Sequence, residues 1–211
     1  MKTKTKGFLL MASIVLATTF TLSCSGDDGG GDPSSSSNGG GGSNCTADFG
    51  SITIGSQVWA KKNLNCNVGD SKCYGNDPEN CTKYGRLYDW NTAMTACPSG
   101  WHLPTDAEWD ILIDFAGGSE TAGAKLKATS GWNNNGNGTD NYGFSALPGG
   151  NGLSGLGGSF GNVGNDGYWW SATEESANIA HYQQMSYYDD YASTGYGGVK
   201  SLLSSVRCIK D

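Results

Sequence analysis

The stretch that decides how the central part of this chain folds is residues 99–110, SGWHLPTDAEWD, which places a histidine and three acidic residues close together. Thr105 and Glu108 stand in the Ser/Thr-x-x-Glu relation of a capping box, in which the threonine hydroxyl accepts the glutamate amide and the carboxylate accepts the threonine amide. Acidic side chains in a first helical turn are also stabilised by the helix dipole. The stretch therefore predicts a helix start, and its spacing does not require His102 and a carboxylate to converge on a metal.

Three short helices are predicted around this cap. A glycine pair at 117–118 ends the central helix. Residues 88–97 predict a preceding helix with Asp89 as its N-cap, and residues 119–129 predict a following helix capped by Ser119. The predicted apolar faces comprise Trp109, Leu112, Ile113 and Ala116 in the central helix, and Trp90, Ala93, Met94 and Cys97 in the preceding helix.

Strands are predicted on both sides of the helices. Residues 49–59 alternate apolar and polar side chains and break at Gly55-Ser56, which indicates a hairpin. Glycine-rich strands return after the helices, and the 34 glycines are accompanied by 7 tryptophans and 10 tyrosines. This composition indicates a loop-rich fold pinned by aromatic side chains. We therefore predict one α+β domain over residues 45–211, with short helices packed on twisted antiparallel strands.

The N-terminal segment predicts export and lipidation. Three lysines within the first six residues precede an apolar run at residues 7–20, which fits a secretory signal and is short for a membrane span. Cys24 follows a small residue, as in a bacterial lipoprotein processing site, although Thr21 stands where an aliphatic residue is usual. We expect a lipoprotein signal peptide over residues 1–23 and an acyl anchor on Cys24; a simple cleaved signal with a spare cysteine is the alternative.

After Cys24, the segment up to residue 44 contains no apolar side chain around which a hydrophobic core could form. Residues 24–44 therefore predict a disordered Gly/Ser/Asp tether with a reach of roughly 25 Å. Acyl chains, at about 0.8 kcal/mol per buried methylene, would hold the protein on a membrane. Asp27 and Asp28 resemble acidic signals that send some lipoproteins to the outer face of the cell, and plain solubility is the alternative. We therefore expect an outer-membrane-anchored, surface-exposed lipoprotein.

Charge argues against nucleic acid as a partner. The net charge of −7 becomes −10 once the three signal lysines are removed, and the ten remaining Lys and Arg residues are scattered. Setting Cys24 aside leaves six cysteines, an even number that suits an oxidising compartment. Cys66, Cys73 and Cys81 lie in a polar loop at spacings of seven and eight, which favour disulfides over a zinc knuckle.

An oxygen-rich loop at residues 131–144 imitates the start of an EF-hand with Asn133, Asn135 and Asn137. Its twelfth position is Phe144, however, and no acidic residue opens it. We interpret the segment up to Asn141 as a series of Asn-Gly turns, with calcium binding as the alternative. We predict no metal and no cofactor for the domain.

Several motifs together resemble a known family. The spacing Trp-x-x-Ala-x-x-x-Cys at residues 90–97, with Val206-Arg207-Cys208, resembles the signature of C-type lectin-like domains, and LPTDAEW at residues 103–109 resembles their formylglycine-generating branch. The chain resembles the Fibrobacter succinogenes major paralogous domain family most fully. That resemblance rests on CPSGWHLPTDAEWDIL (97–112), TDNYGFSALPGG (139–150), GYWWSAT (167–173) and SVRCIKD (205–211).

The resemblance implies a C-type lectin-like fold stapled by disulfides, a cell-envelope setting and no established biochemical activity. It also implies that Cys97 pairs with Cys208, tying the first helix to the final strand. Cys45, Cys66, Cys73 and Cys81 then allow three pairings, of which we favour Cys45–Cys66 with Cys73–Cys81.

Three functions are disfavoured by missing residues. An enzyme of the formylglycine-generating type needs a late pair of thiols, and no cysteine lies between Cys97 and Cys208. A serine hydrolase is equally poorly supported, because His102 and His181 are the only histidines and no Gly-x-Ser-x-Gly motif occurs. Calcium-dependent lectins carry Glu-Pro-Asn or Gln-Pro-Asp, and neither triplet is present.

The remaining class is a binding or adhesion module for a polysaccharide or a protein at the cell surface. Residues 174–200 hold five tyrosines among Ser, Asn, Asp and Gly, a mixture typical of antibody binding loops. In C-type lectin-like folds the same late region forms the ligand face. The predicted contact residues are Tyr187, Tyr188, Tyr191 and Tyr196. The alternative is a structural envelope lipoprotein whose tyrosines are buried in an ordinary sheet.

Overall fold

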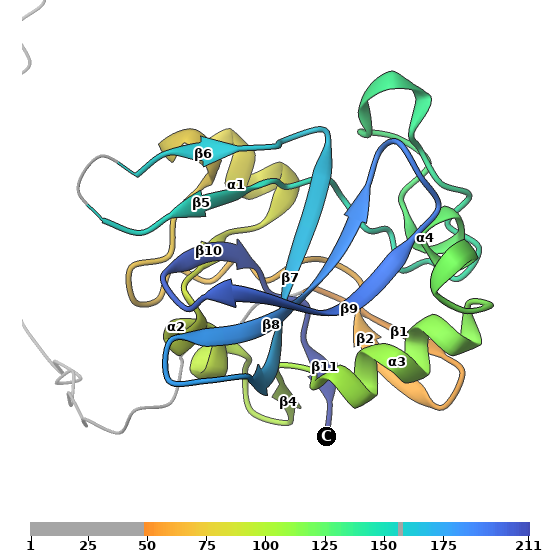
Figure 1. Ribbon diagram of the computed structural model, residues 1–211, viewed down its shortest axis with the longest axis horizontal. Coiled ribbons are helices and arrows are strands. Elements are labelled where there is room, and N and C mark those ends of the chain that lie inside the picture. The colour runs from red at the N-terminus through yellow and green to blue at the C-terminus, as the bar shows by residue number, and fades with distance from the viewer. Residues whose placement is uncertain (1–48, 156–157) are drawn as a thin grey trace, which may run out of the picture. The chain divides into compact units, whose positions relative to one another are not determined.

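The structure of the protein is a computed structural model that describes residues 49–155 and 158–211 (Figure 1). The predicted signal peptide, the predicted tether, Cys24 and Cys45 lie outside the described residues. The described residues form an α+β fold of short helices and mostly antiparallel strands, as the sequence predicts. Among them, no helix combines the length and the apolar character that a membrane crossing requires.

The described helices lie between the first hairpin and a run of strands from β5 to β11, and only β7, β8 and β9 among the described strands exceed four residues. The helices are η1 (Tyr74–Asn76), α1 (Pro78–Tyr84), α2 (Trp90–Ala96), α3 (Asp106–Phe115), α4 (Ser119–Leu126) and η2 (Asn133–Asn135). The strands are β1 (Ser51–Ile54), β2 (Gln57–Ala60), β3 (Leu87–Tyr88), β4 (Trp101–His102), β5 (Asn151–Leu153), β6 (Phe160–Gly161), β7 (Asp166–Glu174), β8 (Ile179–Ser186), β9 (Ala192–Val199), β10 (Leu202–Ser205) and β11 (Ile209–Lys210).

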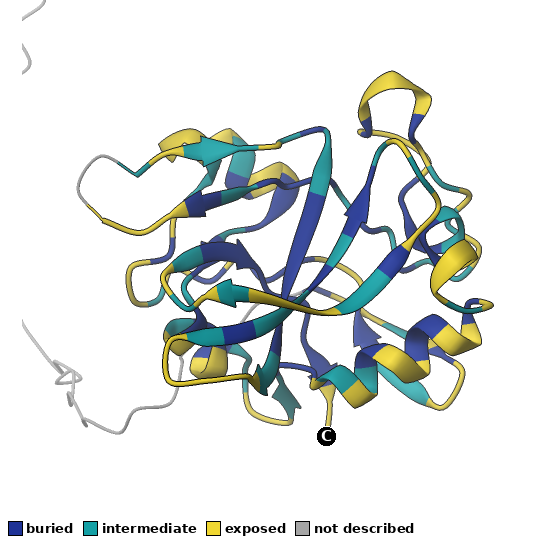
Figure 2. Cartoon of the chain, viewed as in Figure 1, coloured by how far each residue is buried: buried dark blue, intermediate teal, exposed yellow. Residues whose placement is uncertain are grey.

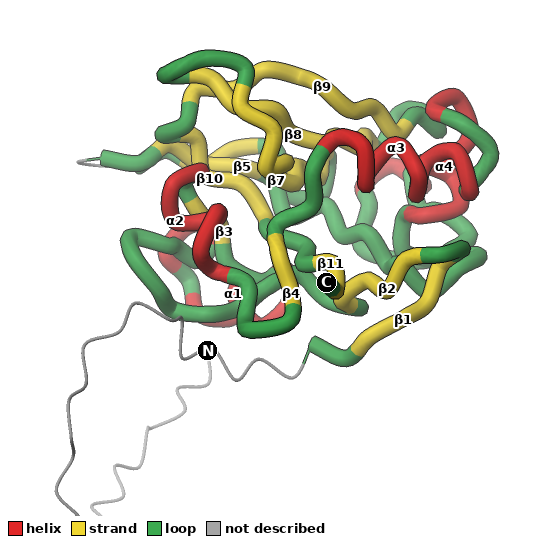
Figure 3. Tube along the Cα trace, turned by 90° about the horizontal axis from the view of Figure 1, so that it is seen from below, coloured by secondary structure: helices red, strands yellow, loops and turns green. Residues whose placement is uncertain are grey.

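Two sheets carry these strands. The smaller sheet has the order β1-β2-β11-β4, so the first predicted hairpin and the C-terminal strand lie side by side. The larger sheet has the order β6-β5-β10-β7-β8-β9, with β3 paired to β10 and with β10 parallel to β7. Figure 3 shows the small sheet below the large one, with α1 and α2 on one side of the molecule and α3 and α4 on the other.

Strand β7 separates two hydrophobic cores, and Figure 2 shows it buried along most of its length. Trp169 belongs to the core under α3 and α4, whereas Trp170 belongs to the core beside α2. Both rings are fully buried, and their N–H groups donate to Asn63 Oδ1 at 2.9 Å and to the Tyr88 carbonyl at 2.7 Å. Neither tryptophan lies at the surface, because cores cover both faces of β7.

The C-terminal segment is tied to distant parts of the chain. Cys208 forms a disulfide with Cys97, 111 residues earlier, as the family resemblance implies. The neighbouring Arg207 is fully buried and donates two hydrogen bonds to Asn63 Oδ1 at 3.0 and 2.8 Å. Its remaining hydrogen bonds go to the carbonyls of Ala60, Lys61 and Phe144.

The polar loop before α1 is also stapled. Cys73 pairs with Cys81 across eight residues, which is the pairing that we favoured. Cys66 is disulfide-bonded as well, and Cys45, the partner predicted for it, lies outside the described residues. This disulfide ties the middle of α1 to the segment that precedes the helix.

The helix starts follow the sequence closely. Thr105 Oγ1 accepts the Glu108 amide at 3.4 Å, and Glu108 Oε2 accepts the Thr105 amide at 2.8 Å, so the predicted capping box is confirmed. Asp89 caps α2 by accepting the Thr92 amide at 3.0 Å, which confirms the predicted N-cap. The predicted apolar face of α3 is buried throughout.

Two local predictions about the helices are wrong. Ser119 is the first residue of α4 and makes no capping hydrogen bond, because Gly118 occupies the N-cap position. Met94 is 43% exposed, since α2 turns Ala93 and Ala96 toward the second core instead.

Candidate functional site

The predicted tyrosine-rich region forms β8, β9 and the loop between them. Tyr182 on β8 pairs with Tyr196 on β9, and their rings stack with centroids 5.8 Å apart. Tyr168 on β7 meets the Tyr182 ring edge-on, with centroids 5.7 Å apart. A row of three aromatic rings therefore crosses three neighbouring strands.

Three of the four predicted contact residues are exposed beside one another. The exposed fractions of Tyr188, Tyr191 and Tyr196 are 70%, 47% and 48%. They line one shallow hollow of about 50 Å³, together with Gln184, Ser186, Asp189 and Ser193. We call Tyr188, Tyr191 and Tyr196 the tyrosine surface. Its exposed aromatic area is apolar surface that folding does not bury, and such surface is available to a ligand.

Tyr187 differs from the other predicted contact residues. It is half-buried, packs against the core under α3 and α4, and meets the Tyr188 ring edge-on at 5.4 Å. Tyr187 therefore supports the tyrosine surface from below. Tyr168 and Tyr182 were not predicted from the sequence, because only the register of β7, β8 and β9 brings Tyr182 beside Tyr196 and Tyr168 beside Tyr182.

Close backbone contacts hold the β8–β9 loop against its neighbours. The Gly123 amide in α4 donates to the Asp190 carbonyl at 2.9 Å, and a Cβ on Gly123 would lie 2.4 Å from the Tyr191 carbonyl oxygen. A Cβ on Gly136 would similarly lie 2.2 Å from the Tyr187 carbonyl oxygen. Only glycine fits at either position, so the close approach of these two glycines to the backbone of the loop determines where the loop lies.

A buried cation closes the inner side of the same loop. Lys127 is 2% exposed, and its Nζ donates to the carbonyls of Ser186 at 3.0 Å and Asp189 at 2.6 Å. Burial lowers the pKa of Lys127, while the charges of Asp190 and Asp189 act in the opposite direction. Burial also raises the pKa of Tyr182.

His102 lies between two carboxylates. Its Nε2 is 2.7 Å from Glu108 Oε1, and its Nδ1 is 2.6 Å from Asp211 Oδ1. The histidine and a carboxylate of the opening motif therefore do meet across the helix cap, which the spacing alone did not require. Partial burial by itself would lower the pKa of His102, but the hydrogen bonds that the ring donates to the Asp211 and Glu108 carboxylates, together with the charges of these carboxylates, raise it.

His181 makes a second link of this kind. Its Nδ1 is 2.5 Å from Asp106 Oδ2 and its Nε2 is 3.6 Å from Glu175 Oε2, so it joins β8 to the first turn of α3. In the described residues, the hydrogen bonds of both histidine rings go to carboxylates. No group of three or more His, Cys, Asp and Glu side chains there could hold a metal ion.

The Asn-rich loop has the geometry of consecutive turns. Asn134 and Asn135 have positive φ angles of 50° and 63°. The Asn137 Oδ1 accepts the Trp132 amide at 3.0 Å, and the Asn133 side chain donates to Asn165 Oδ1 at 3.0 Å. Two of the side chains that imitate an EF-hand are thus engaged in hydrogen bonds within the protein.

These observations define a small α+β domain with two cores, a disulfide-tied C-terminal segment and a tyrosine-lined hollow on its longest strands. The chain belongs to the Fibrobacter succinogenes major domain family (Fib_succ_major), whose family model matches residues 52–210. No curated protein and no solved structure matches the chain.

Proposed function

We propose that this protein is a non-enzymatic binding module, anchored at the cell surface by a lipid on Cys24, that binds a neutral glycan or a surface partner through the tyrosine surface. One observation carries the proposal: three large aromatic side chains stand exposed around a single hollow. Burying them would have favoured folding by roughly 1.5–3 kcal/mol for each large side chain, yet the fold leaves them in water.

The chemistry of the hollow suits a sugar. A tyrosine ring offers apolar area to the face of a pyranose, and its hydroxyl keeps a hydrogen bond to water or ligand. Gln184 and Ser193 supply neutral polar groups between the rings. Asp189 also lines the hollow, so anionic polymers would be repelled and neutral glycans favoured.

The proposal includes a C-type lectin-like arrangement of the domain. The small sheet joins the first hairpin to the C-terminal strand, and the disulfide between Cys97 and Cys208 ties α2 to the same segment. Both features support that arrangement, and the tyrosine surface falls in the late region that serves as the ligand face in such folds. Nucleic acid is not a proposed partner, given the net charge of −7.

A glycan and polysaccharide array probed with the purified protein tests the binding function. Tyr188→Ala, Tyr191→Ala and Tyr196→Ala should each lose about 1–2 kcal/mol of binding to the ligand identified, as central interface residues do. The melting temperatures of the Tyr188 and Tyr191 variants should change little, because these rings are exposed, whereas Tyr196→Ala also removes the ring that stacks on Tyr182 and should lower the melting temperature slightly. Phe115→Ala, which truncates a 51% exposed ring on α3, is the matched control. Normal binding by all three folded variants would favour the structural envelope role instead.

The anchor is tested separately. Cys24→Ala should move the protein from the membrane fraction to the soluble fraction, because the acyl chains would be lost. A variant that still partitions into detergent would contradict the lipid assignment. That result would not bear on the proposal that the tyrosine surface binds a ligand.

A further inference from the structure

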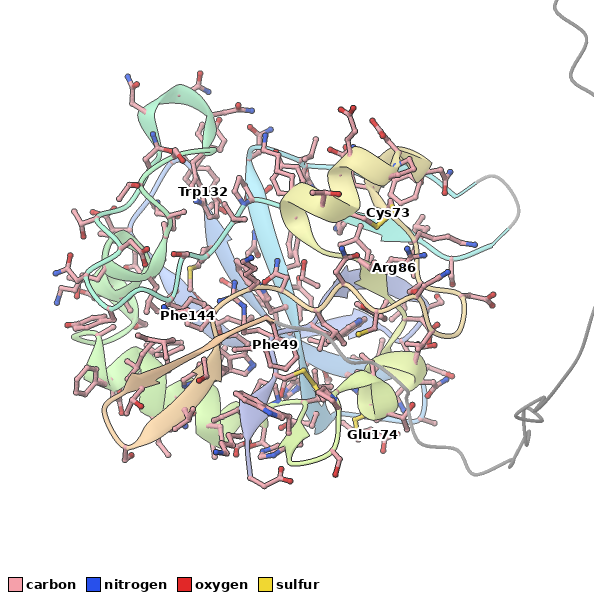
Figure 4. The ribbon with its side chains drawn as sticks, turned by 180° about the vertical axis from the view of Figure 1, so that it is seen from behind. Phe49, Cys73, Arg86, Trp132, Phe144 and Glu174 are labelled. Carbon is pink, nitrogen blue, oxygen red and sulfur yellow. A yellow bond between two sulfur atoms is a disulfide. The ribbon has the colours of Figure 1, made fainter. Side chains whose placement is uncertain are left out.

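A second hollow, of about 750 Å³, lies on other elements than the tyrosine surface. Its walls come from the segment after β2, the end of α1, the chain at residues 143–147 and Arg207. Phe49, which forms part of one wall, is labelled on the rear face of the protein in Figure 4. We call this hollow the lysine cavity, after Lys61, Lys62 and Lys83 in its lining. Its volume is that of an ordinary small-molecule site, roughly 300–1,000 Å³.

The lining of the lysine cavity is cationic. Lys61, Lys62, Lys83 and Arg207 line it, and none of the described lining residues is Asp or Glu. Four positively charged side chains of the described residues therefore lie around one opening, although the chain as a whole carries a net charge of −7. A hollow lined by one sign of charge focuses the field and attracts ions of the opposite sign.

The three lysines are available to a ligand. Each is exposed, and in the described part of the chain none of them forms an ion pair with a carboxylate. Lys83 Nζ lies 4.7 Å from the centre of the Tyr84 ring, which leaves its three N–H donors free to contact an anion. Lys200, by contrast, contacts the Glu174 carboxylate.

Arg207 adds a fixed positive charge to the cavity wall. Its guanidinium donates to neutral oxygens alone, namely Asn63 Oδ1 and three backbone carbonyls. Asp140 is the carboxylate that acts on it electrostatically, but that side chain is held by the amide and hydroxyl of Ser145 at 2.7 and 2.5 Å. Burial lowers the pKa of Arg207 to about 9, so the group remains charged at neutral pH.

We propose that the lysine cavity binds a compact acidic oligosaccharide, that is, a few sugar rings carrying carboxylates. Lys61, Lys62 and Lys83 would contact the carboxylates, while the largely buried Phe49 and Tyr84 form apolar parts of the wall against which the sugar rings would lie. Flexible lysine ammonium groups adapt to carboxylates at variable spacing better than a rigid guanidinium fork does. A long polyanion is disfavoured, because the overall negative charge of the protein repels it before it reaches the cavity.

Titration calorimetry of the full chain with trigalacturonate tests this proposal, with maltotriose as the neutral probe and pyrophosphate as the inorganic anion. Lys61→Gln/Lys83→Gln should weaken trigalacturonate binding about tenfold or more, since each lost contact is a charge-assisted hydrogen bond. Lys72→Gln/Lys210→Gln removes the same charge from exposed lysines outside the cavity lining and should change the affinity less than twofold. Affinity should also fall as salt is raised, because the contacts are charged.

Three results would overturn the proposal. Failure of trigalacturonate to bind removes the ligand class, and equal losses in both double variants would mean a general charge effect. Binding of pyrophosphate without trigalacturonate would mean an anion site that does not recognise sugar. The Tyr188→Ala variant should bind trigalacturonate normally, so failure here and failure of the tyrosine surface are distinguishable.

Discussion

The tyrosine surface and the lysine cavity are held in place by different physical means. Tyr188 and Tyr191 of the tyrosine surface stand on a loop whose backbone is fitted against glycines of α4 and the Asn-rich loop, and Tyr196 follows on β9. The lysine cavity rests on one buried charge, Arg207, whose hydrogen bonds join segments that are far apart in the chain. The first region is therefore sensitive to small additions of volume, whereas the second is sensitive to the loss of a single side chain.

The two regions also suit different ligands. Exposed rings and neutral hydroxyls act at short range and respond weakly to salt, so they favour neutral surfaces. Unpaired lysines attract anions over a distance of about 10 Å at 0.1 M salt. One domain can thus present a neutral and a cationic recognition surface without mixing them.

The largest effect is expected at the base of the lysine cavity. Arg207→Met removes the hydrogen bonds to Asn63 Oδ1, which then keeps only the Trp169 N–H, and to the carbonyls of Ala60, Lys61 and Phe144. It should lower the free energy of unfolding by about 3–5 kcal/mol, because each hydrogen bond from a charged group contributes about 1.5–3 kcal/mol. Arg86→Met is the control, because its half-buried guanidinium hydrogen-bonds chiefly to Ser71 and should cost about 1–2 kcal/mol. Equilibrium urea unfolding measures both, and equal losses would show that the cavity does not depend on Arg207.

An intermediate effect is expected under the tyrosine surface. Gly123→Ala places a Cβ 2.4 Å from the Tyr191 carbonyl and 2.6 Å from the Asp190 carbonyl, so the loop must move. The overpacking cost of about 1–3 kcal/mol exceeds the roughly 1 kcal/mol that alanine gains in a helix. We expect a net loss of about 1 kcal/mol and a changed environment of Tyr188 and Tyr191, seen as shifts of their ring NMR signals.

The matched control for this prediction is Gly161→Ala on β6, where the nearest atom to the new Cβ is 3.7 Å away. It should leave the tyrosine signals unchanged. If Gly123→Ala also leaves them unchanged, the loop is not positioned by this contact. In neither variant should trigalacturonate binding change, because the lysine cavity does not share these residues.

The two regions also differ in how far the sequence could predict them. The tyrosines of the tyrosine surface lie within ten positions of one another, so local composition was sufficient to point to three tyrosines that are exposed in the structure. The lysine cavity combines residues from position 49 to Arg207, and no local pattern links them. Its cations appear scattered in the sequence because only the fold brings them to one opening.

The same reasoning explains the fold predictions. The capping box at Thr105 depends on residues three positions apart, so local chemistry determined it. The burial of Trp169 and Trp170 depends on two separate cores that meet at β7, and strand alternation alone does not reveal both. The pairing of Cys97 with Cys208 followed from family resemblance, since no spacing rule reaches across 111 residues.

The smallest effect is expected at His102, which belongs to neither region and therefore serves as a test of their independence. The raised pKa of His102 means that its contribution to stability is present below about 6.5, its ordinary value, and is lost as the pH rises through the folded-state pKa. For Glu108, burial opposes the change, but hydrogen bonds to Thr105 and His102 lower its pKa. Its contribution is therefore present above about 4.5 and is lost as the pH falls through its folded-state pKa.

Both contributions are present together between about pH 4.5 and 6.5. His102→Gln should thus be less stable than the natural protein in that window by a few tenths to about 1 kcal/mol, because the His102 and Asp211 side chains are 40% and 61% exposed and screened by water. The difference should shrink at pH 9 and at pH 3, as measured by urea unfolding across the range. A stability difference that stays constant with pH would mean that His102 acts through packing alone. Binding at the tyrosine surface and in the lysine cavity should be unchanged by this variant, since His102 lines neither hollow.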